Sequence, residues 1–238
     1  MEDRLVERVL VVTAHPDDVD FGAGGTIAQW TDSGIHVTYL IITDGDAGGF
    51  DPDVPRTEIP VIRRAEQRSA GDCVGVHDVR FLGYRDGELA VTHDLRCDIS
   101  RVIRQVRPQR MLIQSPERNW DRIQASHPDH LAAGEAAIQA IYPDARNPFA
   151  HITLGRDEEL EAWSVPEVWV MAHPNPTHFV DVTNEFDRKL AAIRSHASQL
   201  PDPDAVEGWM RTRLAEMAQR GGLPEGRLAE AFFIAHTA

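Results

Sequence analysis

Cysteine and basic residues are scarce in this chain. It has 238 residues, and Cys73 and Cys97 are its only cysteines. Two cysteines exclude a disulfide framework and a cysteine-rich zinc site. Lys and Arg together number 24 against 38 Asp and Glu, so the formal net charge is −14. Because a nucleic-acid backbone is held by clustered cations, we expect no nucleic-acid partner.

Long apolar runs are also missing. No stretch approaches the roughly 18 uninterrupted apolar residues that a membrane helix needs, so we expect no membrane span. The first eight residues alternate acids and bases and do not have the pattern of a signal peptide. We therefore expect a cytoplasmic protein. The length is typical of one domain, which we place at residues 1–238.

Short apolar runs alternate with helix-like segments along the chain. The β-branched run from Val9 to Ala14 predicts a strand buried on both faces. Further strands are predicted at 37–42, 78–82, 111–113, 168–171, 179–182 and 231–235, and helices at 22–34, 60–75, 93–107, 128–142, 185–200 and 206–220. This alternation predicts an α/β fold, a Rossmann-like three-layer sandwich with a mostly parallel central sheet.

Two clusters with the order His-Pro-Asp stand out from this pattern. His15, Asp17 and Asp18 follow the first predicted strand directly, and residues 126–130 read Ser-His-Pro-Asp-His. In a parallel sheet, the loops after the strands meet at the ligand-binding edge. We therefore expect the two clusters to converge there.

The second cluster has the pattern of a helix start. Pro128 suits the first position of a helix, so His127 is the expected N-cap. His130 then lies in the first turn, and the spacing i, i+3 places both imidazoles on one side of it.

Two imidazoles and one carboxylate, with a fourth position open, form the ligand set of a catalytic zinc site. Each residue alone also has a structural explanation, because Asp17 suits a turn and His127 and Asp129 suit a helix cap. Two such clusters, one after a buried strand and one opening a helix, are improbable by chance. We therefore favour a metal site.

The two clusters resemble those of the LmbE-like (PIG-L) family of zinc-dependent N-deacetylases, and the resemblance covers most of the chain. The matching segments are Ala14 to Asp18, Gly24 to Ile27 and His127 to His130, supported by Arg63 to Glu66, Leu82 to Gly87 and Phe186 to Gln199. The resemblance implies a hydrolase that removes an acetyl group from the amine of an N-acetylglucosamine-type sugar or glycoconjugate.

The resemblance also implies roles for individual residues. It implies that His15, Asp18 and His130 bind Zn²⁺, although Fe²⁺ suits the same ligands. It implies that Asp17 is the general base. His127 would be the donor that stabilises the tetrahedral oxyanion or protonates the leaving amine.

Contacts with the substrate are predicted from less specific signals. The Arg-x-x-Glu match points to Arg63, although Arg64 is adjacent. Many family members have Glu after the second Asp of the first cluster, whereas this chain has a valine and then Asp20, which could replace it. The loop before the second cluster supplies Arg118 and Asp121 as further polar groups.

Three alternatives remain open. A nucleotide-binding Rossmann domain is disfavoured because Ile27 occupies the third glycine position of its signature. A metal-dependent amidase acting on a non-sugar amide or a thiol conjugate would use the same metal core. A noncatalytic sugar-binding protein has no need of both Asp17 and His127. The sequence leaves the sugar, the aglycone and a homo-oligomeric state open.

Two further expectations concern charged residues away from the clusters. We expect His151 at the surface. We expect Arg101, Arg104 and Arg107 to form a solvated helix face.

Overall fold

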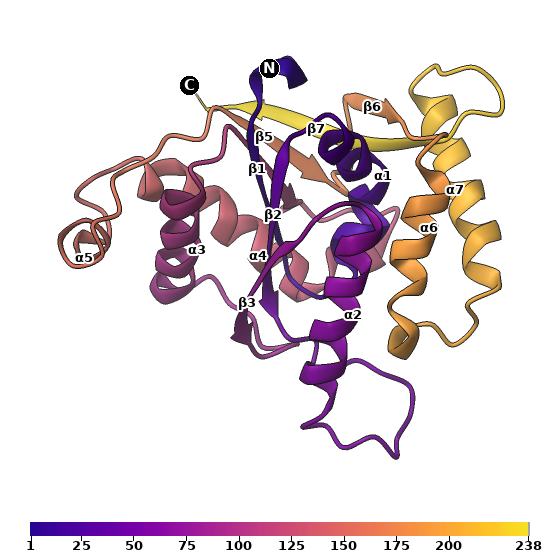
Figure 1. The fold of residues 1–238 in the computed structure, drawn as a ribbon, viewed down its shortest axis with the longest axis horizontal. Coiled ribbons are helices and arrows are strands. Elements are labelled where there is room, and N and C mark those ends of the chain that lie inside the picture. The colour runs from indigo at the N-terminus through magenta and orange to yellow at the C-terminus, as the bar shows by residue number, and fades with distance from the viewer. Residues whose placement is uncertain (238) are drawn as a thin grey trace.

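The computed structural model describes residues 1–237 as a seven-stranded sheet with helices on both faces (Figure 1). The strands are β1 (Arg8–Thr13), β2 (His36–Thr43), β3 (Asp78–Tyr84), β4 (Arg110–Gln114), β5 (Glu167–Met171), β6 (His178–Asp181) and β7 (Ala229–His236). The helices are α1 (Asp18–Asp32), α2 (Ile59–Cys73), α3 (His93–Val106), α4 (Pro128–Gln139), α5 (Ile152–Arg156), α6 (Phe186–Arg194) and α7 (Ala205–Arg220).

The strand order is β3-β2-β1-β4-β5-β7-β6. The first five strands in this order pair in parallel. Strand β7 is antiparallel to both of its neighbours, β5 and β6. The predicted mostly parallel α/β sandwich is confirmed, and the insertion of β7 between β5 and β6 is a feature that the sequence analysis did not predict.

The central strands bury both of their faces. In β1, Leu10 and Val12 belong to the core shared with α3 and α4, whereas Val9 and Val11 belong to the core shared with α1 and α2. Figure 1 shows α3 and α2 on opposite sides of β1 and β2. A continuous apolar run suits such a strand because neither face meets water. A third, smaller apolar cluster joins α6 to α7.

Two of the predicted helices are shorter than expected. The helix predicted at 128–142 ends as an α-helix at Gln139 and continues as a wider π-turn over Ala140–Ala145. Tyr142 has extended backbone angles because the following proline disfavours the helical region. The helix predicted at 185–200 ends at Arg194, and a separate 3₁₀ turn covers Ala197–Gln199.

The expectations for His151 and Arg104 are wrong. The side chain of His151 is 2% exposed, and its Nε2 lies 3.0 Å from a carboxylate oxygen of Asp144. The Arg104 guanidinium is buried and donates to main-chain carbonyls in residues 144–150. The physical reason is that this segment lies against α3 and covers both side chains. Among the described residues, no helix has the length and apolar character needed to cross a membrane.

Candidate active site

The first cluster lies in the tight connection between β1 and α1. Asp17 is the N-cap of α1 and has φ 92° and ψ −30°, a backbone conformation that non-glycine residues rarely adopt. Its N–H donates to Oε1 of Gln67 at 2.8 Å. Its carbonyl accepts the N–H groups of Asp20 and Phe21 at 2.9 and 3.1 Å. Such strained residues persist where surrounding contacts hold them, and they concentrate at functional sites.

The second cluster opens α4 as predicted. His127 is the N-cap, and Pro128 occupies the first turn. The Nδ1 atom of His127 accepts the N–H of Asp129 at 3.2 Å. Because Nδ1 is an acceptor, the proton of the neutral imidazole is on Nε2. Burial lowers the pKa of His127, and the charges of His15 and His130 lower it further. His127 is therefore a neutral imidazole that presents an N–H donor.

The predicted convergence of the two clusters is confirmed. The ring centroids of His15 and His127 lie 5.0 Å apart, those of His15 and His130 lie 5.2 Å apart, and those of His127 and His130 lie 5.3 Å apart. The three imidazoles come from two segments that are more than 100 residues apart, and they meet beyond the carboxyl ends of β1 and β4.

Three side chains present ligand atoms to a common point. Nδ1 of His15 lies 3.2 Å from Nε2 of His130 and 3.4 Å from Oδ2 of Asp18. Oδ1 of Asp18 lies 3.0 Å from Nε2 of His130. Ligands about 2.0–2.1 Å from a tetrahedral metal ion are separated by roughly 3.3 Å. These separations fit a metal ion held by His15, Asp18 and His130.

The outer nitrogen of each of these two imidazoles is also engaged. Nε2 of His15 lies 3.0 Å from Oδ1 of Asp86 and 3.2 Å from Oδ2 of Asp129. Nδ1 of His130 lies 3.4 Å from the carbonyl of Ala125. Outer hydrogen bonds of this kind fix the tautomer and the ring orientation of metal-binding histidines. This role of Asp86 and Asp129 was not predicted from the sequence, although both residues lie in segments that carry the family resemblance.

The carboxylates favour positive charge at this point. Burial lowers the pKa of His15, but hydrogen bonds to Asp129, Asp18 and Asp86 outweigh it and raise the pKa to about 12. Burial likewise lowers the pKa of His130, and Asp18 more than compensates. A divalent cation supplies the same positive charge that these carboxylates favour.

Asp17 lies beside this group, and its carboxylate is held by Arg63. The guanidinium of Arg63 donates to Oδ2 of Asp17 at 3.0 Å and to the carbonyls of Pro16 and Gly45. Burial raises the pKa of Asp17 to about 6, although the Arg63 charge acts in the opposite direction. Arg64 instead forms a two-pronged ion pair with a different aspartate, so Arg63 is the arginine that faces the cluster.

The residues expected to contact the substrate are found in different places. Asp20 is fully buried, and its Oδ2 accepts hydrogen bonds from Gln67 and His196. The expected direct contact is incompatible with this burial, because Asp20 has no exposed surface. Arg118 is exposed, and its guanidinium lies 5.6 Å from the ring centroid of Trp120. Asp121 lines a cavity beside the cluster, whereas Arg118 does not.

A cavity of about 700 Å³ opens beside the metal-facing atoms. Asp18 and His130 form part of one wall, and residues of α7 form another. The size is within the usual range for small-molecule sites, about 300–1,000 Å³. A substrate in this cavity can therefore reach the ligand cluster.

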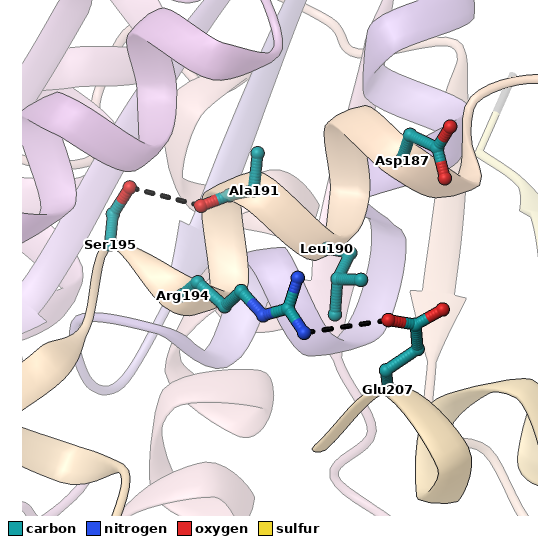
Figure 2. Close-up of a pocket in the computed structure, with 6 residues that line it drawn as sticks. All are labelled: Asp187, Leu190, Ala191, Arg194, Ser195 and Glu207. Atoms are coloured by element: carbon teal, nitrogen blue, oxygen red, sulfur yellow. Dashed lines mark hydrogen bonds and ion pairs between the residues drawn. The ribbon is translucent and has the colours of Figure 1, made fainter. Parts of the chain in front are cut away.

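A second hollow, of about 510 Å³, lies between α6 and the start of α7. Figure 2 shows Arg194 reaching Glu207 across it, at 3.4 Å, and the Ser195 hydroxyl bonded to the carbonyl of Ala191. Because these groups bond to each other and the hollow contains no residue of the two clusters, it is not the candidate site.

Comparison with known proteins agrees with this geometry. The family model described as "PIG-L: GlcNAc-PI de-N-acetylase" matches residues 10–141, which include both clusters. The chain belongs to the PIG-L family. It is 36% identical to a diacetylchitobiose deacetylase of Thermococcus kodakarensis, over 86% of this chain and 74% of that protein. It is 34% identical to a probable N-acetyl-α-D-glucosaminyl L-malate deacetylase 2 of Bacillus cereus, over 82% and 84% of the two chains.

A solved structure of the family has the same fold along nearly the whole PIG-L chain described here. It is an N,N'-diacetylchitobiose deacetylase from Pyrococcus horikoshii in complex with an inhibitor. The TM-score is 0.89 at 31% identity, and the match covers 98% of this chain and 85% of that one.

Proposed function

We propose that this protein is a metal-dependent hydrolase that removes the acetyl group from an N-acetylglucosamine-type sugar or glycoconjugate. The observation that carries the proposal is the convergence of His15, Asp18 and His130 at metal-ligand separations, with Asp17 and His127 beside them. The relatives with deacetylase names support the reaction, and the acetamido sugars in those names support the substrate class.

The donor set suits a catalytic metal rather than a structural one. Two imidazoles and one carboxylate leave a coordination position for a reactant, and this set is typical of Zn²⁺ while also suiting Fe²⁺. We assign Zn²⁺ as the cofactor, held by His15, Asp18 and His130. When bound, the ion acidifies a water molecule and polarises the carbonyl of the acetamide.

Asp17 has the position and charge of a general base. Its carboxylate is 18% exposed and the adjacent residue Asp18 lines the cavity, while Arg63 holds Oδ2. Asp17 takes a proton from the attacking water, and general base catalysis is most effective when the pKa lies near the operating pH. Gln67 and Arg63 fix the backbone and the side chain of Asp17 so that its position does not change during the reaction.

His127 stabilises the other side of the reacting amide. Because its Nδ1 accepts the Asp129 N–H, its Nε2–H is directed away from the helix start. This N–H donates to the oxyanion of the tetrahedral intermediate, where a preorganised donor is most effective. Asp17 then passes the proton that it took from the water to the leaving amine, which makes acetate and the free amino sugar the products.

The experiment that tests the proposal combines metal content with acetate release. The purified protein is analysed for zinc and iron, and acetate is measured with N-acetylglucosamine and a small set of its glycosides. About one metal ion per chain together with acetate release is the expected result. Bound metal without acetate release would indicate that the substrate is a different amide. No metal in protein purified without chelator, and none taken up on addition, would refute the proposal.

A further inference from the structure

Two cations in the lining of the cavity are not held by ion pairs. Arg213 on α7 and Arg122 in the loop before α4 both line it, and both are half-buried. Within residues 1–237, neither guanidinium has a hydrogen-bond or ion-pair partner: Arg122 donates only through its backbone N–H, and Arg213 has only a cation–π contact. Burial lowers the pKa of Arg213, and the charge of the exposed Glu216 offsets this only in part.

Other buried arginines of the molecule show the usual arrangement. Arg110 is fully buried and pairs with Glu167 and Asp3, and Arg63 donates to Asp17 and to two carbonyls. Arg213 has only a cation–π contact, 6.0 Å from the ring centroid of Trp209. This contact orients the side chain and does not neutralise its charge.

The acidic groups of the same cavity do not neutralise the two arginines. Asp18 faces the metal site, and Glu230 pairs with the buried Lys189 at 2.7 Å. Asp202 accepts the N–H groups of residues 204 and 205. Asp121 and Glu216 are exposed. The half-buried groups left without partners are therefore cations, and a guanidinium binds carboxylate or phosphate oxygens in a two-pronged geometry.

We propose that Arg122 and Arg213 bind a carboxylate or phosphate group on the aglycone of the acetamido sugar. This inference rests on the proposed deacetylase function and adds the chemical class of the substrate. The acetamide reaches Asp18 and His130, and the anionic end of the same molecule contacts the two arginines elsewhere in the lining. The two residues determine specificity and do not take part in the chemical step.

The test uses matched glycosides of N-acetylglucosamine. The carboxymethyl glycoside is compared with its neutral isostere, the carbamoylmethyl glycoside, and N-acetylglucosamine 1-phosphate separates a phosphate from a carboxylate preference. We expect kcat/KM to be at least about tenfold higher for an anionic substrate than for the neutral glycoside. The difference should be in KM, because the interaction is the same in the ground state and the transition state. Added salt should reduce this difference between the anionic and the neutral substrate.

Two variants assign the preference to the residues. Arg213→Gln and Arg122→Gln should each bring the ratio of anionic to neutral kcat/KM close to one. Arg211→Gln is the matched control, because Arg211 is on the same helix, pairs with Glu207 at 3.0 Å and does not line the cavity. It should keep the wild-type ratio, so a loss there would indicate a general effect of charge on α7.

The outcomes separate this inference from the proposed function. If no glycoside releases acetate, the deacetylase proposal fails. If acetate is released with equal efficiency from charged and neutral glycosides, the deacetylase proposal stands and the anion site is refuted. Preference for N,N'-diacetylchitobiose over both anionic substrates would also refute it, since this wall would then bind a neutral sugar.

Discussion

The two walls of the catalytic cavity differ in how their polar groups are satisfied. At the metal-facing wall, His15 bonds through both ring nitrogens, and Asp17 is held by Arg63 and Gln67. At the α7 wall, the Arg213 guanidinium contacts the ring of Trp209 but has no hydrogen-bond or ion-pair partner among the described residues. Groups that perform chemistry must be in place before the substrate arrives, because reorganisation during the reaction raises the barrier. Groups that recognise a substrate, in contrast, obtain their hydrogen-bond or ion-pair partner from the substrate itself.

The largest effect should come from removing a ligand atom at the metal-facing wall. His130→Ala removes Nε2, which lies 3.2 Å from Nδ1 of His15. We expect the purified variant to lose the metal and its kcat/KM to fall by roughly a thousandfold or more. Metal analysis and acetate release measure both. His77→Ala, at an exposed histidine, is the control, and full metal content in His130→Ala would remove His130 from the ligand set.

Asp17→Asn tests the general base independently of the metal ligands. The amide keeps the size of the side chain but cannot accept a proton, so kcat should fall by about 10²- to 10⁴-fold while the metal is retained. Single-substrate kinetics together with metal analysis distinguish this from loss of the ion. Asp53→Asn changes an exposed aspartate in the loop before α2 and should have no effect. A fully active Asp17→Asn would show that another group is the base.

A smaller effect should follow from changing the support of a ligand. Both oxygens of Asp129 accept backbone N–H groups, from Gly87 at 2.7 Å and from Leu89 at 3.3 Å. In Asp129→Asn, the amide nitrogen would face one of these donors, and one of the two carboxylate charges behind His15 would be lost. We expect metal affinity or activity to fall by about 10- to 100-fold. Titration with a competing chelator measures the affinity. An unchanged affinity would show that the carboxylate of Asp86 alone is sufficient behind His15.

The smallest kinetic effect should come from changing Asp144, which lies outside both walls and pairs with Arg96 and His151. Burial raises the pKa of Asp144, but Arg96 and His151 outweigh it and hold the pKa below its usual value. This carboxylate therefore stabilises the fold at neutral pH, and the contribution is lost as the pH falls through the folded pKa. Asp144→Asn should lower the free energy of unfolding by about 1–2 kcal/mol at pH 7 without changing kcat.

Denaturant unfolding of Asp144→Asn at several pH values checks that prediction. The difference from the wild type should shrink as the pH falls below the ordinary carboxyl pKa of 3.8. A constant difference down to pH 3 would show that the ion pair with Arg96 is not its source.

Much of the metal-facing wall could be predicted because its signals are local. The apolar run before His15 identifies a strand, and Pro128 identifies the start of a helix with His127 as its cap. Parallel strands then bring their ends to one edge whatever the rest of the chain does. The fold class and the convergence of the histidines follow from these features.

The other features depend on pairings that no local pattern specifies. Asp86 reaches His15 from a loop after β3, 71 residues along the chain. Arg104 is on the helix face expected to be solvated, but the carbonyls of a following segment enclose it. Asp20 was placed near the substrate by its position after Asp18, whereas the first turn of α1 directs it into the interior. In each case the partner comes from a distant segment.

The position of β7 has a consequence for the order in which the site is assembled. Strand β6 has β7 as its only neighbour in the described sheet, and α7 packs mainly against β7. Both segments with a His-Pro-Asp cluster, which end at His130, are synthesised long before Ala229 is made. During synthesis, which proceeds from the N-terminus, a metal could be bound by a chain that cannot yet select its substrate. Selectivity is then the last property that the growing chain acquires.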